Sequence, residues 1–594
     1  MSNRSFSTQG AVFCLLASAV FHLVACNPQT PSSHVWLTSE AGDKCAEQEA
    51  VVFTKANANA NAFIIHPDDR RQTIDGFGGS LTESSAFVLA CLSPEDRNAI
   101  LNELFGEEGA NFSVTRTHIG ASDFSVEGRY SLCEQEGDTA LASFSLDRDK
   151  EGFPKDKYPQ IKDEHYDLYH LMLDVWRLKQ SQQDKTFRIM ANTWTAPAWM
   201  KENGKYYERE NGFHRGGALL PEYYQTYADY IARYVEAWRA EGVDIWAVTP
   251  VNEPMGNDGG WESMDFPPAV ETEFIAKYLG PTFRKRGLGD VAIYGFDQNI
   301  FEMEPYTEAI YGNAEARSYT TGMAVHWYGS TLDCFPEVLD RVHAANPDKT
   351  LFHSEGCIDN LGLDGWPGVG DYAGYKESGW FGNDRFWWDT TATDWAYSTQ
   401  WAGETHPRYV PVHRYARYII NGINHWLTGF CDWNIVLDSI GGPNHVGNFC
   451  GAQVMVNYSP TANEALTGPT TNDQRPTTND QRPTIYFTPY YYVLKQFSRS
   501  MRPGDIVLGV QRPTTNEALT GPTTNDQRPM TNDQRLTTND QQPIYLCASV
   551  NAEGQYAINI LNTGKATNVP VQIGEYAAQI EMPANSVKTI LVKL

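Results

Sequence analysis

The sequence Trp246-Ala-Val-Thr-Pro-Val-Asn252-Glu253-Pro254 predicts a buried strand that runs directly into a carboxylate. Its apolar run, which begins at Ile245, is typical of a strand covered on both faces. Pro254 then ends the strand, so Asn252 and Glu253 stand where the chain leaves the sheet. In α/β proteins this edge of the sheet carries the chemistry. Taken alone, the motif also allows a strand-end glutamate held in a structural ion pair.

A second segment of the same kind is Thr350-Leu-Phe-His-Ser-Glu355-Gly356. It is a short apolar strand that ends in an acid, and Gly356 allows the backbone to turn sharply just past that acid. Two strand-end carboxylates on one rim are what glycoside hydrolysis requires. One protonates the leaving oxygen, and the other attacks the sugar carbon or directs water at it. The pair therefore indicates a glycosidase more strongly than either segment alone.

Strand-like and helix-like segments alternate through the middle of the chain. Strands are expected around Phe77 and over residues 113–119, 187–193, 245–251, 291–296, 322–326, 350–353 and 429–433. Helices are expected over residues 93–104, 161–179, 221–240, 271–285, 336–345 and 409–426. Repeated βα units of this length predict an α/β fold, a parallel (β/α)8 TIM barrel. Glu253 follows the fourth strand and Glu355 the seventh, so both should face the same mouth.

The composition indicates a large folded protein. With 594 residues and 41% hydrophobic content, the chain has room for one large domain and a smaller one. The 16 Trp and 31 Tyr residues suggest flat faces for stacking on sugar rings, although buried aromatic side chains would account for most of them. The net charge of −27 makes nucleic acid and anionic membrane surfaces poor partners.

Two other chemistries are excluded by spacing. The glycine-rich Ile74-Asp75-Gly76-Phe77-Gly78-Gly79 lacks the GxGxxG spacing of a dinucleotide site, and close backbone approach at a strand end is the better interpretation. Beyond the N-terminal signal, the cysteines form no CxxC pair and no zinc-binding pattern, so we expect no metal site. The predicted reaction requires no organic cofactor.

Residues 1–26 resemble an export signal. Arg4 precedes an apolar run over residues 11–25, which is too short to cross a bilayer comfortably. The run ends in Leu23-Val24-Ala25-Cys26, which resembles a bacterial lipobox that is cut before the cysteine and acylated on its thiol. A plain secretory signal is the alternative. With residues 27–44 as a tether, the protein would be exported and membrane-anchored by lipid on Cys26, in the periplasm or at the cell surface.

The C-terminal part contains a duplicated low-complexity block. The sequence NEALTGPTTNDQRP at residues 463–476 recurs unchanged at residues 516–529. Such blocks have almost no apolar residues and cannot build a core, so we expect residues 460–484 and 511–543 to be disordered insertions. Loop closure costs rise only slowly with length, which would make these insertions tolerable.

Eight segments in order, spanning nearly all of the chain from about residue 50, resemble glycoside hydrolase family 30. This is the family of lysosomal-type glucosylceramidases and their β-1,6-glucanase relatives. The resemblance implies a retaining β-glycosidase with a barrel over residues 75–456 and an all-β sandwich from residues 45–74 and 485–594. The segments are FGGSLTESSA (77–86), TRTHIGASDFS (115–125), NTWTAPAWMK (192–201), WAVTPVNEP (246–254), AVHWY (324–328), HSEGC (353–357), DWNIVLDSIGGPN (432–444) and YYVLKQFSRSMRPG (491–504).

Carried over residue by residue, the resemblance makes Glu253 the acid/base and Glu355 the nucleophile. Asn252 would bind the 2-hydroxyl of the sugar, and Asp123 would hold its outer hydroxyls. The other lining residues would be Trp194 and Trp433 as walls of the glucose pocket, with Asn444, His326, Trp327, Tyr328 and Arg116.

Each of these lining residues also has a structural interpretation. Trp327 and Tyr328 could pack within the barrel, His326 could be a hydrogen-bonded core histidine, and Arg116 an ordinary ion-pair partner. If Arg116 lies beside Glu355, it should keep that residue charged and leave the proton on Glu253. The two acids would then lie about 5 Å apart and act by double displacement.

Three positions depart from the family pattern, namely Val251, Gly356 and His445, which follows Gly-Gly-Pro-Asn where an aromatic residue is expected. These departures leave the substrate open among β-1,6-glucan, glucosylceramide and other β-glucosides. A β-xylosidase or β-fucosidase of the same family is an alternative, as is a surface glycan-binding lipoprotein without turnover. The tryptophan-rich stretch 359–407 would shape the leaving-group side or form a core of its own.

Overall fold

The computed structural model describes residues 33–57, 59–207, 209–210, 213–214, 216–256, 260–330, 333–358, 379–389, 392–393, 408–458, 482–513 and 543–594. The expected export signal with Cys26, both copies of the repeat and most of the tryptophan-rich stretch lie outside these residues. Among the helices of the described ranges, none combines the length and the apolar character needed to cross a bilayer.

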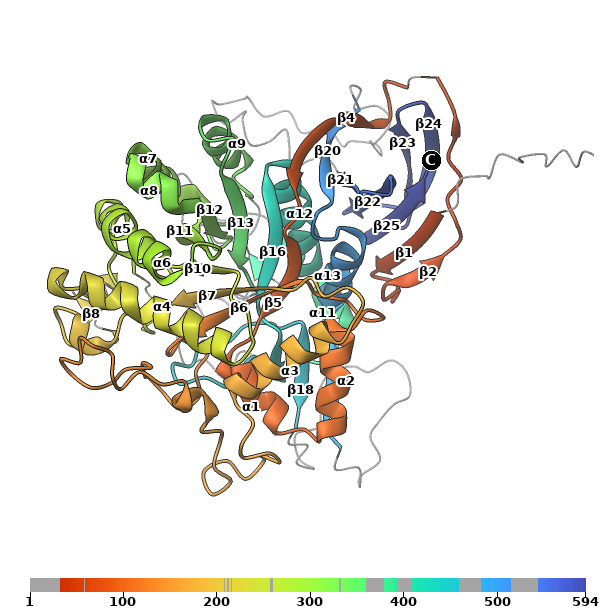
Figure 1. The fold of residues 1–594 in the computed structure, drawn as a ribbon. Helices are drawn as coiled ribbons and strands as arrows, with labels where there is room; N and C mark the ends of the chain where they lie inside the picture. Colours follow the sequence, from red (N-terminus) through yellow and green to blue (C-terminus); the bar gives the residue numbers. More distant parts are fainter. Residues whose placement is uncertain are drawn as a thin grey trace, which may run out of the picture.

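A closed barrel of parallel strands forms the larger part of the protein (Figure 1). Each strand pairs with the next one along the chain, and the last pairs with the first. All eight predicted strands are present, so the TIM-barrel prediction is confirmed. They are β5 (Gly76–Ser80), β6 (Val114–Ile119), β7 (Arg188–Thr193), β10 (Ala247–Thr249), β11 (Ala292–Asn299), β12 (Thr320–His326), β13 (Thr350–Glu355) and β16 (Leu427–Asn434).

Helices surround this barrel. Those predicted from periodicity are α2 (Pro94–Phe105), α3 (Leu168–Gln180), α4 (Tyr224–Ala240), α5 (Pro268–Phe274), α6 (Gly280–Arg286), α9 (Pro336–Ala345) and α12 (Pro411–Asn424). In α4, the aromatic residues at three- and four-residue spacing, such as Tyr227 and Trp238, are fully buried. Helix α1 (Glu83–Ala90) was not predicted, because all of its residues are buried and it has no polar face to reveal a period. The other unpredicted helices are α7 (Glu304–Gly312), α8 (Ala314–Tyr319), α11 (Asp384–Trp388) and α13 (Pro489–Ser500).

A separate all-β region lies beside the barrel (Figure 1). Its strands form one ten-stranded sheet around a single apolar core, which includes Phe63, Ile558, Val571 and Ile590. The predicted second, all-β region is therefore confirmed. In sheet order the strands are β2 (Ala46–Gln48), β1 (Ser33–Ser39), β25 (Ser586–Lys593), β22 (Gln555–Asn562), β21 (Ile544–Val550), β20 (Ile506–Gln511), β4 (Phe63–Thr73), β23 (Thr567–Ile573), β24 (Tyr576–Met582) and β3 (Thr54–Lys55).

Two boundaries differ from the expected ones. The sequence places residues 33–44 in the tether, whereas β1 pairs with β25 along its whole length. The strand was not predicted because the segment is rich in polar residues. Only alternate positions such as Val35 and Leu37 are apolar and buried. The sequence also places residues 485–500 in the sandwich, whereas α13 packs against both β5 of the barrel and β25. It therefore serves as the barrel helix that follows β16.

Residue Gln496 in α13 links the barrel to the all-β region. Its buried side chain accepts a hydrogen bond from the hydroxyl of Thr38 at 2.5 Å. Its amide group lies within hydrogen-bond distance of the Trp36 carbonyl (3.2 Å), the Val587 carbonyl (3.4 Å) and the Thr589 hydroxyl (3.1 Å). These partners belong to β1 and β25, so one amide satisfies polar groups of two strands at the junction.

We expect Gln496→Leu to lower the free energy of unfolding by about 1–3 kcal/mol, because it leaves buried polar groups without partners. Urea unfolding followed by circular dichroism measures the change. Gln180→Leu, at the partly exposed end of α3, is the matched control and should change stability by less than about 0.5 kcal/mol. Equal effects of the two substitutions would contradict this role of Gln496.

Candidate active site

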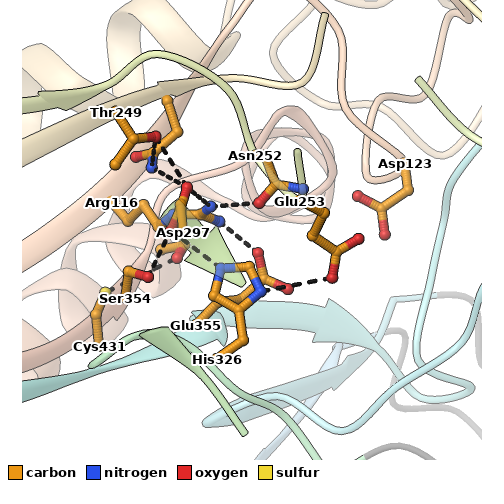
Figure 2. Close-up of polar contacts among 12 residues, drawn as sticks. Arg116, Asp123, Thr249, Asn252, Glu253, Asp297, His326, Ser354, Glu355 and Cys431 are labelled. Carbon is orange, nitrogen blue, oxygen red and sulfur yellow. Dashed lines mark hydrogen bonds and ion pairs between the residues drawn. The ribbon is translucent and has the colours of Figure 1, made fainter. Parts of the chain in front are cut away.

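The two predicted catalytic glutamates meet at the carboxyl end of the barrel (Figure 2). Glu253 follows β10, and Glu355 is the last residue of β13. A carboxylate oxygen of one lies within 4.8 Å of a carboxylate oxygen of the other. Glu355 is only 6% exposed, so its charge must be balanced within the protein.

Arg116, on β6, supplies the nearest positive charge. Its guanidinium has no exposed surface and forms an ion pair with Glu355. It also donates to Asn252 Oδ1 at 2.5 Å and to Asp297 Oδ2 at 2.9 Å. Burial opposes its charge, but Asp297 and Glu355 outweigh this effect and raise the pKa of Arg116 above its ordinary value. Arg116 is thus permanently charged and holds one oxygen of the predicted nucleophile.

Asp297, at the end of β11, is the residue on which most of these contacts converge. Its Oδ2 also accepts hydrogen bonds from Asn192 at 2.5 Å and Thr249 at 2.9 Å. Its Oδ1 accepts from Ser354 at 2.6 Å. Burial would raise the pKa of Asp297, but Arg116 and His326 lower it far below the usual range, so this carboxylate is ionised.

His326, the last residue of β12, lies between two carboxylates. Its Nε2 is 3.0 Å from Asp297 Oδ1, and its Nδ1 is 3.5 Å from Glu253 Oε1 (Figure 2). Burial opposes protonation, but Glu355 and Asp297 raise the pKa of His326 from 6.5 to about 9. At neutral pH the ring is therefore an imidazolium that faces Glu253.

The backbone at Glu253 and Asp297 adopts an unfavourable conformation. Glu253 has a φ angle of +51° and Asp297 one of +61°. Both lie in the left-handed region, which residues other than glycine rarely adopt. The amide of Glu253 donates to the carbonyl of Asp297 at 3.1 Å, so the two strand ends brace one another. Strained residues held by their surroundings are typical of functional sites.

Asp123 lies in the loop after β6, on the Glu253 side of the cluster (Figure 2). Its Oδ2 accepts a hydrogen bond from Asn448 at 2.9 Å, whereas its Oδ1 is buried and has no hydrogen-bond partner within the described chain. Burial and the nearby charge of Glu355 raise the pKa of Asp123 well above 3.8. An unsatisfied oxygen in this position is suited to a substrate hydroxyl.

The aromatic residues predicted for the site divide into two groups. Trp194 and Trp433 stack on one another with ring centroids 5.2 Å apart. The Cζ atom of Arg116 lies 4.7 Å from the Trp194 ring centroid and 5.4 Å from that of Trp433. The hydroxyl of Tyr328 donates to Glu355 Oε1 at 3.0 Å. Tyr328 thus contacts Glu355 directly, whereas the tryptophans contact Arg116, and their role as pocket walls stays a prediction.

Two predicted lining residues are engaged elsewhere. Trp327 packs edge-on against Tyr415 and Tyr418 of α12, which is the packing role that the sequence left open. A Cβ atom at Gly356 would lie 2.8 Å from the Trp327 ring, which explains the glycine after Glu355. Asn444 uses its side chain within its own turn, where Oδ1 accepts from the amides of residues 446 and 448. It therefore shapes the loop that presents Asn448.

Glu253, His326 and Glu355 are the group of described residues whose ligand-type atoms are close enough for a metal ion. A metal ion there would have to displace the proton that Glu355 and Asp297 favour on His326. Glu355 is in addition already paired with Arg116. The cluster therefore favours proton transfer and charge stabilisation by the side chains themselves.

Sequence reasoning missed the polar residues that support the pair, namely Asn192, Thr249, Asp297, Ser354 and Asn448. Asp297 directly follows the predicted fifth strand, so the strand-end signal used for Glu253 could have found it. Asn192, Thr249 and Ser354 are small polar residues within strands and Asn448 lies in a loop, and their type alone does not distinguish a site from a satisfied core.

Comparison with known families agrees with this geometry. The sequence profile of the "Glycosyl hydrolase family 30 TIM-barrel domain" matches residues 74–395 and 384–464. The chain belongs to glycoside hydrolase family 30. It is therefore a glycosidase, and the resemblance noted in the sequence is confirmed.

Relatives of this family 30 enzyme include both of its expected branches. Over 418 residues it is 27% identical to the lysosomal acid glucosylceramidase of Mus musculus, covering 69% of this chain and 68% of the relative. It is 25% identical to an endo-1,6-beta-D-glucanase of Neurospora crassa, covering 74% of this chain and 73% of the relative. The fold is shared with SrfJ from Salmonella typhimurium, with a TM-score of 0.69 at 22% identity over 95% of this chain and all of that one.

We expect His326 to stabilise the folded enzyme in a pH-dependent way. Its folded pKa of about 9 lies above its ordinary 6.5, so its contribution is fully present below pH 6.5 and is lost as the pH rises through about 9. The difference in unfolding free energy between the wild type and His326→Gln should therefore shrink by a few kcal/mol over this interval. Unfolding titrations at several pH values measure it.

His413→Gln is the matched control. His413 is also buried, but burial lowers its pKa to about 3, so it stays neutral throughout this interval. Its substitution should give a difference that does not vary between pH 6.5 and 9. A constant difference for His326→Gln as well would show that His326 is neutral in the folded enzyme.

Proposed function

We propose that this glycoside hydrolase is a retaining enzyme that cleaves β-D-glucosidic bonds by double displacement. The carboxylate oxygens of Glu253 and Glu355 within 4.8 Å of one another carry this proposal. Retaining enzymes hold their carboxyl groups about 5–5.5 Å apart, whereas inverting enzymes need about 6.5–9.5 Å to admit a water molecule.

The charges around the two glutamates indicate which one is the nucleophile and which one is the acid. Arg116 and His326 carry two positive charges, and Asp297 and Glu355 carry two negative ones. The cluster is therefore neutral when Glu253 is protonated. This state suits Glu355 as the nucleophile and Glu253 as the acid that protonates the departing oxygen.

Arg116 holds Oε2 of Glu355, so we assign the attack on the anomeric carbon to Oε1, which accepts the Tyr328 hydroxyl. The ester that forms removes the negative charge of Glu355. Glu253 has given its proton to the departing oxygen, so it is now the anion in place of Glu355 and the cluster is again neutral, which favours the ionised form of Glu253. Glu253 can now take a proton from water, and that water releases the sugar with its original configuration.

The substrate belongs to the β-glucosides by analogy with relatives named glucosylceramidase and endo-1,6-glucanase. Asp123, with one oxygen unsatisfied, would accept a hydroxyl of the bound sugar. Parallel assays with β-1,6-linked gluco-oligosaccharides and with glucosylceramide decide between the two substrates. Aryl β-xylosides and β-fucosides in the same series test the other sugars of the family.

Glu253→Gln and Glu355→Gln should each reduce turnover of an aryl β-glucoside by at least about a thousandfold, because each removes a group that forms or breaks bonds. Proton NMR of the first sugar released by the wild type should show the β-anomer. Azide should restore turnover to Glu253→Ala and give a β-glucosyl azide.

Glu302→Gln is the matched control, since Glu302 is a half-buried glutamate near Glu253 but is not one of the acid pair. It should retain most of the activity. An α-anomer as first product would exclude the retaining mechanism. Sugar binding without turnover by the wild type would instead support the glycan-binding alternative.

We also propose that the protein is exported and held at a membrane by lipid on Cys26. The support is the apolar segment over residues 11–25 and the Leu-Val-Ala-Cys sequence that ends it. Cys26→Ala should move the protein from the membrane fraction to the soluble fraction of fractionated cells. Cys45→Ala, which alters a cysteine of the folded part, should leave the distribution unchanged. A Cys26→Ala protein that stays with membranes would exclude the anchor.

A further inference from the structure

An ion pair between His445 and Glu262 joins loops at the mouth of the barrel and has no part in the chemistry described above. His445 lies in the loop after β16, and Glu262 in the loop that begins at Glu253. The His445 Nε2 atom is 3.1 Å from Glu262 Oε1, and both side chains are largely buried. The Nδ1 atom is 2.8 Å from the carbonyl oxygen of Ser125, in the loop after β6. One imidazole thus contacts all three loops.

The hydrogen-bond geometry is that of a protonated His445 facing an ionised Glu262. A backbone carbonyl can only accept a hydrogen bond, and an ionised carboxylate can only accept one as well. Both ring nitrogens must therefore donate, which only an imidazolium can do. Burial opposes this charge, but Glu262 raises the pKa of His445 above its ordinary 6.5.

Two basic side chains, Arg129 and Lys201, lie next to the pair. Arg129 is 3.5 Å from Glu262, and its charge opposes protonation of His445. The Nζ atom of Lys201 donates to the carbonyl of Ser263, and burial lowers the pKa of Lys201 to about 7. Glu262 is the acid that faces Arg129 and His445, and together with Glu202 it opposes the effect of burial on Lys201.

The same loops carry Asp123 and Glu253. Asn448, in the His445 loop, donates to Asp123 Oδ2 at 2.9 Å. The backbone amide of His445 donates to the Ser125 carbonyl at 2.9 Å, close along the chain to Asp123. Any movement of His445 away from Glu262 would therefore move Asn448 and Asp123 relative to the loop that starts at Glu253.

We propose that the His445–Glu262 ion pair is a latch that positions Asp123 for the outer hydroxyls of the bound sugar. His445 and Glu262 are then positioning residues for substrate binding, and they act through Asp123. The inference rests on the proposed glycosidase function and adds to it. Because the cation of the pair is a histidine, the latch makes substrate binding depend on pH.

The sign of that dependence follows from the raised pKa of His445. The latch is closed while His445 is protonated and is lost as the pH rises through its folded pKa. Since Asp123 contacts the bound sugar and not the breaking bond, opening should raise KM and change kcat little. The wild type should thus show an alkaline rise of KM.

The test uses His445→Phe and Glu262→Gln with an aryl β-glucoside across the pH range. Each variant should raise KM about tenfold, the cost of a charge-assisted hydrogen bond, with kcat within about twofold of the wild type. The alkaline rise of KM should be absent from both. The double variant should be no worse than either single one, because both substitutions remove the same pair.

His425→Phe is the matched control. His425 also pairs with an aspartate, Asp340, at 3.0 Å, but it lies just before β16, at the end of the barrel away from the acid pair. It should leave KM and its pH profile unchanged. A KM in His445→Phe that equals the wild-type value, or a fall in kcat alone, would overturn the proposal.

NMR titration of His445 tests the latch without turnover. Its pKa should lie above 6.5 in the wild type and fall in Glu262→Gln, a substitution that keeps the size of the side chain. An unchanged titration would overturn the latch even if activity is altered. A wild type that binds and titrates as expected but hydrolyses no glycoside would refute the proposed function alone.

Discussion

Burial of the Arg116 charge is the constraint on which the active site depends. A guanidinium without solvent contact is costly unless acidic and polar partners compensate its charge, and removal of one partner from such a pair is strongly destabilising. Here the partners are Glu355, Asp297 and Asn252, with Trp194 and Trp433 over the planar group. They come from different strands of the barrel, so only the closed ring can provide them together.

The same constraint determines how protons are distributed. Because Asp297 is fixed as an anion by Arg116, it can hold His326 as a cation. The imidazolium then faces the acid/base glutamate, whose own backbone is held in a left-handed conformation against Asp297. The contacts of Asp297 therefore both stabilise the fold and orient the groups that react. The strained backbone lies at Glu253, the acid/base residue itself.

Around the acid pair, the loops at the mouth of the barrel hold the residues proposed to contact the outer part of the sugar. Asp123 keeps one oxygen unsatisfied, and Asn448, Asn444 and His445 hold the loop that supports it. Arg116 and Glu355 lie on strands, and Glu253 follows one closely. The groups proposed to contact the outer part of the sugar lie on loops, where a substitution can alter substrate preference without disturbing the acid pair.

The sequence by itself determined the barrel, its eight strands and the two glutamates. Buried strands and the acids at their ends produce local sequence patterns that can be recognised without knowledge of the tertiary contacts. Through the family resemblance the sequence also placed Arg116 in the lining of the site, whereas its ion pair with Glu355 came from the structure. Only the tertiary structure revealed the central place of Asp297, the protonation of His326 and the packing role of Trp327. It likewise showed that residues 33–39 form a sheet strand and that α13 belongs to the barrel. These features depend on contacts between residues that lie far apart in the chain. A local sequence pattern cannot show which distant residues will be in contact.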